Sequence, residues 1–85
     1  MGDRNQEYLI YGLKTCGYCA AAQELLSSLG YEYSYFNLDD KQDFLTEVKR
    51  FYSHKTVPII LRMDSSTGSV KFIGGYSELQ EHVND

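Results

Sequence analysis

The feature that most constrains this chain is the pair Cys16 and Cys19, the only two cysteines among its 85 residues, in the segment TCGYC. An apolar run over residues 8–11 ends just before this segment, and a helix-like stretch follows it. Two thiols three positions apart, between a strand and a helix, indicate a redox site. Two ordinary buried cysteines in a helix, and a zinc site, are the alternatives.

A zinc site is the weaker alternative, because a structural zinc ion takes four protein ligands. The chain has no second cysteine pair, and His54 and His82 stand far from Cys16 and Cys19 in the sequence. We interpret both histidines as surface residues. The net charge of −4 argues against nucleic acid as a partner, because phosphate binding favours a basic face.

The length of the chain and its first residues indicate how many domains to expect and in which compartment. Eighty-five residues fit a single domain, residues 1–85, of which residues 1–6 are expected to be a frayed terminus. No apolar run approaches the roughly 18–20 residues that span a bilayer. The polar start MGDRNQE lacks the pattern of a signal peptide. We therefore expect a cytoplasmic protein, in which a cysteine pair is typically catalytic or metal-binding.

Hydrophobic periodicity predicts seven elements in the order β-α-β-α-β-β-α. Residues 8–11 read as a strand buried on both faces, and residues 17–29 as a helix with an apolar stripe that ends at Leu29 and a left-handed cap at Gly30. Residues 31–38 alternate as a half-exposed edge strand, and Asp39 or Asp40 is expected to cap the next helix. That helix has a longer apolar stripe, made of Phe44, Leu45, Val48, Phe51 and Tyr52.

The last third predicts a hairpin and a short helix. Pro58 opens a third strand, residues 70–73 form a fourth, and Ser77 is expected to cap a helix over residues 78–83. The elements together predict an α/β fold with a four-stranded mixed sheet. The second helix is expected on one face of the sheet, and the first and third helices on the other.

The position of Cys16 at a helix start predicts its reactivity. The thiolate is the nucleophile in disulfide exchange, and a free cysteine, with a pKa of about 8.5, is mostly protonated at neutral pH. As an N-cap residue, Cys16 would place its sulfur beside unpaired backbone N–H groups and the positive end of the helix dipole. Lys14 adds a nearby positive charge. Cys16 is therefore expected to attack, and the deeper Cys19 to resolve the mixed disulfide.

Three segments resemble the glutaredoxin family. The segment from Lys14 to Cys19 is similar to the glutaredoxin active site, in which Pro-Tyr usually separates the cysteines. Residues 56–58 (TVP) resemble a segment whose proline is cis in the thioredoxin fold, and residues 74–79 (GGYSEL) resemble the glycine pair before the last helix. The likeness spans about residues 7–83, and it implies a thioredoxin-like fold.

The resemblance also implies a site and partners. Glutathione would serve as co-substrate, with glutathionylated or disulfide-bonded proteins as partners, and the protein would act as a monomer. Cys16 and Cys19 would be the catalytic residues. The residues that would line the glutathione groove are Lys14, Tyr18, Thr56, Val57, Pro58, Gly75, Tyr76 and Ser77. The family often has a further contact from the second helix, for which Lys49 and Arg50 are the candidates.

Two departures from the family pattern raise other readings. Gly17 replaces the usual proline, and in glutaredoxins a small residue here is associated with a [2Fe-2S] cluster. In such a cluster the first cysteines of two subunits and two glutathiones supply the thiolates, so Cys16 would be the ligand. The connection over residues 62–69 also looks longer than in compact family members, and we interpret it as a surface insertion.

Two further functions compete with glutathione-dependent exchange. One is a thioredoxin-like electron donor to ribonucleotide reductase, although such proteins tend to lack the Gly-Gly segment at residues 74–75. The other is a carrier of the [2Fe-2S] cluster.

Overall fold

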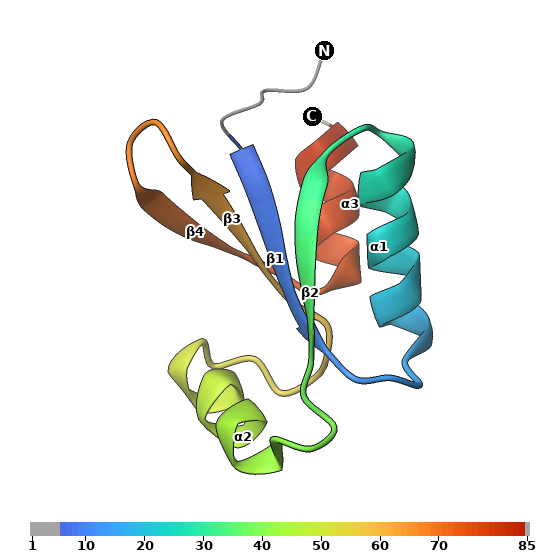
Figure 1. Ribbon diagram of the computed structural model, residues 1–85, viewed down its shortest axis with the longest axis vertical. Coiled ribbons are helices and arrows are strands. Elements are labelled where there is room, and N and C mark those ends of the chain that lie inside the picture. The colour runs from blue at the N-terminus through green and yellow to red at the C-terminus, as the bar shows by residue number, and fades with distance from the viewer. Residues whose placement is uncertain (1–5, 85) are drawn as a thin grey trace.

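The computed structural model describes residues 6–84, and it has the predicted order of elements (Figure 1). Of the frayed terminus predicted over residues 1–6, only Gln6 lies within the described residues, and it begins the first strand. The helices and strands are β1 (Gln6–Gly12), α1 (Gly17–Ser28), β2 (Glu32–Asn37), α2 (Gln42–Phe51), β3 (Ile59–Asp64), β4 (Ser69–Gly74) and α3 (Tyr76–Asn84). Among them, no helix is both long enough and apolar enough to cross a membrane.

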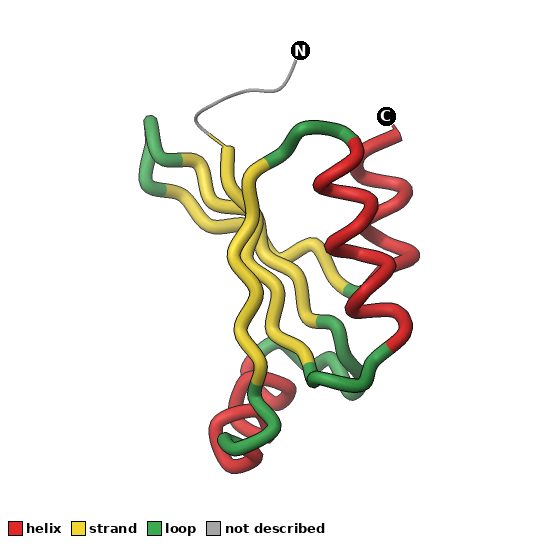
Figure 2. The backbone as a smooth tube through the Cα atoms, turned by 45° about the vertical axis from the view of Figure 1, so that its right-hand side comes forward, coloured by secondary structure: helices red, strands yellow, loops and turns green. Residues whose placement is uncertain are grey.

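The sheet is mixed, with its four strands in the order β2-β1-β3-β4 (Figure 2). β1 pairs with β2 in parallel, because the chain crosses over through α1, and it pairs with β3 in antiparallel orientation. β3 and β4 form the predicted antiparallel hairpin, with a register shift between Ile60 and Leu61. The expected position of β2 at the sheet edge is confirmed, and this arrangement is the thioredoxin-like fold class.

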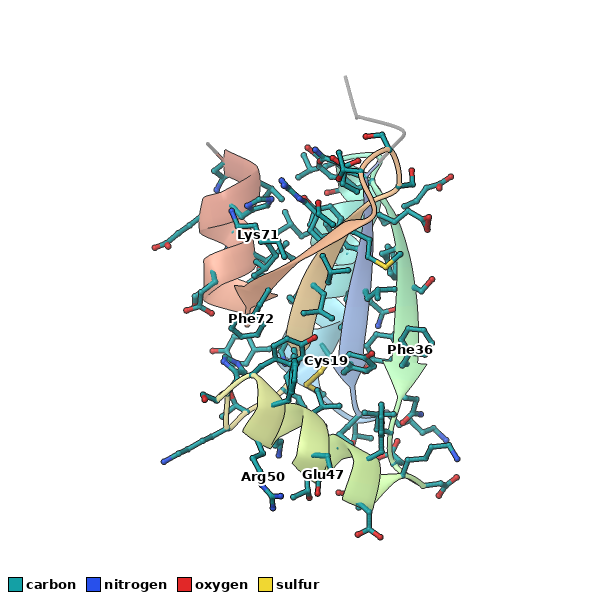
Figure 3. All side chains as sticks on the ribbon, turned by 90° about the vertical axis from the view of Figure 1, so that its left-hand side faces the viewer. Cys19, Phe36, Glu47, Arg50, Lys71 and Phe72 are labelled. Carbon is teal, nitrogen blue, oxygen red and sulfur yellow. A yellow bond between two sulfur atoms is a disulfide. The ribbon has the colours of Figure 1, made fainter. Side chains whose placement is uncertain are left out.

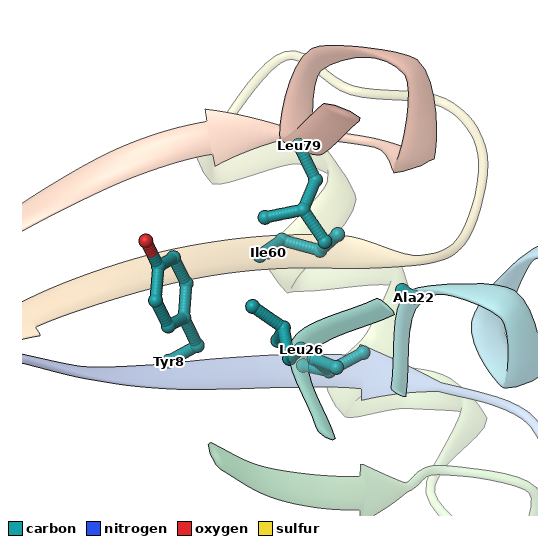
Figure 4. Packing of buried hydrophobic residues seen from close by; sticks show 6 residues of the cluster. Tyr8, Ala22, Leu26, Ile60 and Leu79 are labelled. Carbon is teal, nitrogen blue, oxygen red and sulfur yellow. The ribbon is translucent and has the colours of Figure 1, made fainter. Parts of the chain in front are cut away.

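One face of the sheet packs against α1 and α3 (Figure 4). Tyr8 and Ile10 of β1 and Ile60 of β3 meet the helix residues Leu26 and Leu79, and each of the five is at most 1% exposed. A fully buried side chain of this size contributes roughly 1.5–3 kcal/mol, so this layer supplies much of the stability. The first and third helices share one face of the sheet, as the sequence predicted.

α2 contributes a second, smaller core at the carboxyl ends of β1 and β2 (Figure 1). Leu45 and Val48 of α2 are buried there with Ile59 of β3. Most of the remaining face, turned to the viewer in Figure 3, is not covered by any helix within residues 6–84, and Phe36 and Phe72 are partly exposed on it.

The uncovered face explains two errors in the predicted burial. β1 is not buried on both faces, because Leu9 and Tyr11 point to the second face and are only half-buried. The predicted stripe of α2 is too wide: Phe44 is 48% exposed and Phe51 is 78% exposed. A helix that touches only the end of a sheet buries a narrower strip of its surface.

Three terminal residues also differ from their predicted roles. α1 ends at Ser28, so Leu29 is its C-cap and is exposed, whereas Gly30 has the expected left-handed conformation with φ 81°. The N-cap of α2 is Lys41 and not Asp39 or Asp40. The Asp39 carboxylate instead accepts a hydrogen bond from a backbone N–H at the candidate site, described below.

The connection between β3 and β4 is not a long loop. β3 continues to Asp64 and β4 begins at Ser69, so half of the predicted surface insertion extends the hairpin strands and only residues 65–68 form the turn. The Asp64 carboxylate accepts hydrogen bonds from the hydroxyl and the backbone N–H of Ser66. These bonds hold the pKa of Asp64 below its usual value, and the bond from the Ser66 hydroxyl has the largest effect.

The end of α2 contains a strained residue that offers a test of the local structure. Ser53 has φ 53°, its N–H donates to the Arg50 carbonyl, and the next N–H, of His54, donates to the Lys49 carbonyl. This pattern is a Schellman turn, in which glycine usually takes the left-handed position. Ser53 therefore adopts a conformation that is costly for a residue with a Cβ.

We expect Ser53→Gly to stabilise the fold by about 0.5–1 kcal/mol, because the relief of strain exceeds the extra freedom of glycine in the unfolded chain. Urea denaturation measures the change. Ser53→Ala, which keeps the Cβ, is the control and should show no gain. A Ser53→Gly protein less stable than the parent would contradict the turn.

Candidate functional site

The two cysteines lie where β1 has ended and α1 begins, joined as a disulfide (Figure 3). Cys16 is the N-cap of α1, as predicted, and its Sγ accepts a hydrogen bond from the Cys19 backbone N–H at 3.1 Å. Cys16 is half-buried, whereas Cys19 is 1% exposed. Cys16, at the helix end, is therefore the more accessible of the two residues, and Cys19 lies in the interior.

The Cys19 sulfur lies against Gly12 and Tyr35. A Cβ added to Gly12 would lie 2.7 Å from Cys19 Sγ and 2.5 Å from Tyr35 Oη, so no side chain fits between them. The Tyr35 hydroxyl donates a hydrogen bond to the Leu13 carbonyl in the loop before the cysteines. Burial, and then the Asp39 carboxylate, raises the pKa of Tyr35, so the phenol stays protonated as a donor.

Asp39 fixes the same loop from the other side. Its Oδ2 accepts a hydrogen bond from the Lys14 backbone N–H at 2.8 Å, across 25 positions of sequence. The Lys14 side chain is exposed and is not among the residues that line the groove described next. β2 and the turn after it thus hold the cysteine loop through Tyr35 and Asp39, neither of which the sequence identified as part of the site.

A groove of about 330 Å³ lies next to the cysteine loop. It brings together seven of the eight predicted glutathione-groove residues, all except Lys14. The Val57–Pro58 peptide bond is cis, as the resemblance implied. The rings of Tyr18 and Tyr76 lie 5.8 Å apart between centroids. The lining residues are Tyr18, His54, Thr56, Val57, Pro58, Gly75, Tyr76, Ser77 and Glu78.

The start of α3 forms one wall of this groove and differs from its prediction. The helix begins at Tyr76, so Ser77 is its second residue and not its N-cap. Glu78 reaches back and accepts the Gly75 N–H at 2.7 Å, which is one half of a capping box. The first intrahelical bond runs from the Leu79 N–H to the Gly75 carbonyl. The backbone N–H groups of Tyr76 and Ser77 precede it and can therefore donate hydrogen bonds to an anion.

Both histidines, predicted to be surface residues, are only partly exposed. His54 is half-buried and lines the groove, with its Nε2 3.5 Å from Thr56 Oγ1. His82 is half-buried against Tyr8, with 6.1 Å between ring centroids, and its Nε2 lies 3.4 Å from Arg62 Nη1. The position of His54, two residues before the TVP segment, is the signal that could have placed it near the groove.

The described residues do not fit an iron–sulfur cluster within one chain. Such a cluster takes four thiolates, and the chain has two cysteines, which are joined to each other. Residues 6–84 contain no group of three or more His, Cys, Asp or Glu side chains that could hold a metal ion. A Cβ on Gly17 would have open space around it, so this glycine is not required by packing.

The fold and the site together define a class. A protein that combines a mixed sheet, a dithiol at the start of its first helix and a cis-proline before its third strand is a thioredoxin-like dithiol protein. The family model described as Glutaredoxin matches residues 8–64, more than half of the chain. The chain therefore belongs to the glutaredoxin family, and its cysteine pair is that of a thiol–disulfide oxidoreductase.

Solved structures support this assignment. A buckwheat glutaredoxin–glutathione complex superposes with a TM-score of 0.76 at 25% identity, covering 96% of this chain and 72% of that one. A dithiolic glutaredoxin from Trypanosoma brucei brucei gives 0.71 at 26% identity, with coverages of 95% and 80%. Wheat glutaredoxin gives 0.76 at 17% identity, with coverages of 92% and 71%, and so shares the fold. A search of curated protein sequences found no match.

Proposed function

We propose that this protein catalyses glutathione-dependent thiol–disulfide exchange, reducing glutathione mixed disulfides and protein disulfides. The observation that carries the proposal is the groove beside the dithiol. Tyr18, which stands between the two cysteines, lines it together with the cis Val57–Pro58 segment and the start of α3. The similar buckwheat protein, at 25% identity, was solved in complex with glutathione.

The groove offers complementary groups for a short peptide with charged ends. The backbone of Val57 can pair with an extended peptide as an added strand would. The N–H groups at the start of α3 suit a carboxylate, because the positive end of the helix dipole lies there. Gly75 keeps the groove open, since a Cβ there would lie 3.3 Å from both Glu78 Oε1 and His54 Nε2.

The exchange proceeds through Cys16. Its thiolate attacks the glutathione sulfur of a mixed disulfide, forming a Cys16–glutathione disulfide and releasing the substrate as a thiolate. A second glutathione thiolate then attacks that glutathione sulfur, producing oxidised glutathione and regenerating the Cys16 thiolate. The N–H of Cys19, which meets Cys16 Sγ at 3.1 Å, stabilises negative charge on this sulfur.

Protein disulfides use both cysteines. Cys16 attacks one sulfur and releases the other half of the disulfide as a thiolate, and the Cys19 thiolate then attacks Cys16 Sγ. The second half leaves as a thiolate, and the product is the Cys16–Cys19 disulfide seen here. Two glutathiones reduce it. This cycle needs a glutathione pool, and we propose the cytoplasm as its compartment.

A coupled assay tests the proposal. With glutathione, glutathione reductase and a glutathionylated peptide, we expect steady consumption of reduced nicotinamide cofactor. With thioredoxin reductase in place of glutathione and its reductase, we expect little turnover. The reverse result would identify a thioredoxin-like donor and overturn the proposal.

A further inference from the structure

We propose that His54 determines the substrate specificity of the groove by donating a hydrogen bond from Nε2 to a carboxylate of the glutathione moiety. The inference rests on the proposed function and deepens it. Three observations on residues around the groove carry it: the fixed backbone of His54, the position of its ring, and the charges that surround it.

The backbone of His54 is fixed by the turn that ends α2. Its N–H donates to the Lys49 carbonyl at 2.9 Å, and the left-handed Ser53 reverses the chain just before it. Tyr52, on the other side of the turn, stacks on Phe72 of β4 with ring centroids 4.9 Å apart. The end of α2 is thus tied to the sheet, and the direction of the His54 side chain follows from it.

The ring of His54 is held at the groove. It meets Phe72 edge-on, with centroids 5.7 Å apart and an interplanar angle of 71°. Nε2 lies 3.5 Å from Thr56 Oγ1, and 3.3 Å from where a Cβ of Gly75 would stand. Thr56 belongs to the TVP segment and Gly75 to the glycine pair. Nε2 therefore lies close to both of the segments that the substrate would touch.

The charges around His54 favour an anionic ligand. His54 also lines a second hollow, where Lys49, Arg50 and Lys55 supply positive charge. The carboxylate that faces the groove is that of Glu78, and its Oε1 already accepts the Gly75 N–H. A substrate carboxylate in the groove can therefore approach Nε2 with the three basic residues of the second hollow nearby.

Replacement of His54 tests the inference through substrate binding. With a glutathionylated peptide, His54→Leu should raise KM about tenfold, the loss typical of one hydrogen bond to a charged group. Because the bond is present both before and during the reaction, kcat should change little. His54→Gln, whose amide can donate from a similar position, should recover most of the loss. Lys71→Leu is the matched control, since Lys71 is exposed on β4 and lines neither the groove nor the second hollow, and it should leave KM within about twofold.

Substrate analogues identify the carboxylate. Glutathione has one carboxylate on its glycine and one on its γ-glutamyl residue. A mixed disulfide of the glycine ethyl ester removes the first charge, and a cysteinylglycine mixed disulfide removes the second. The His54→Leu penalty should disappear with one of the two analogues, and that analogue names the carboxylate.

Several results would overturn the inference. An unchanged KM in His54→Leu would do so, and so would a penalty that persists with both analogues. A fall in kcat alone, or a failure of His54→Gln to recover KM, would assign His54 to the fold instead. The wild-type protein is assayed first, because absence of turnover there would refute the proposed function and not the role of His54.

Discussion

Cys16→Ser is expected to abolish turnover of a glutathione mixed disulfide, whereas Cys19→Ser is expected to retain it. The reason is the different placement of the two sulfurs. Cys16 is half-buried at the helix end and its Sγ accepts an N–H at 3.1 Å, while Cys19 is 1% exposed. Loss of a catalytic nucleophile lowers kcat by several orders of magnitude, so we expect a fall of more than about a thousandfold.

The glutathione-coupled assay measures this difference with a glutathionylated peptide. A protein disulfide substrate provides the complementary readout. With it, Cys19→Ser should stop at a covalent mixed disulfide between Cys16 and the substrate, detectable by mass spectrometry. Equal loss of glutathione mixed-disulfide turnover in both variants, or retention by Cys16→Ser, would refute the assigned roles.

Gly12→Ala is expected to destabilise the protein strongly, because the new methyl group has no space. It would lie 2.5 Å from Tyr35 Oη and 2.7 Å from Cys19 Sγ. Neither neighbour moves freely, since the Tyr35 hydroxyl is bonded to the Leu13 carbonyl and Cys19 is tied to Cys16. Overpacking of this kind costs typically about 1–3 kcal/mol, and we expect a value near the upper end.

Urea denaturation of the oxidised protein measures this cost. Gly17→Ala is the matched control, because no atom beyond its chain neighbours and the backbone of its own helix lies within 4 Å of the added Cβ. As an added Cβ at the exposed start of a helix, it should be neutral or stabilise by up to about 1 kcal/mol. A second variant, Gly12→Ala combined with Tyr35→Phe, removes the oxygen nearest the methyl group and should cost less than the sum of the single changes. A single Gly12→Ala protein as stable as the parent would show that the contact is not there.

The local sequence predicted the parts of the molecule that depend on neighbouring residues. The order of elements, the N-cap at Cys16 and the left-handed Gly30 are confirmed. Periodicity and capping act over a few residues, so a short window holds the information for them. The errors concern predicted N-caps, one with a partner elsewhere in the chain and one inside its helix. Asp39 and Ser77 have the chemistry of N-caps. However, Asp39 accepts a hydrogen bond from the Lys14 N–H, and α3 starts before Ser77.

The same division holds for the candidate site. Motifs in order along the chain pointed to Cys16, Val57 and Gly75, and the structure brings most of the predicted groove residues, Val57 and Gly75 among them, into one hollow. The histidine of the groove was missed, although it stands two residues before the TVP segment, because the sequence does not show the left-handed conformation of Ser53 or the contact with the ring of Phe72. The exposure of Phe51 was missed because the apolar stripe of α2 looks the same in the sequence whether or not the sheet covers it.

By itself, the sequence determined a dithiol at a helix start, a thioredoxin-like order of elements and the glutaredoxin family. Only the tertiary structure decided which groups surround that dithiol. Gly12, Tyr35 and Asp39 support the cysteine loop, and His54 and Glu78 face the groove, from positions well separated along the chain. The physical reason is that helix starts and strand periods are set by short-range sterics and hydrogen bonds. The environment of a sulfur, by contrast, is set by the side chains that packing brings within a few ångströms of it.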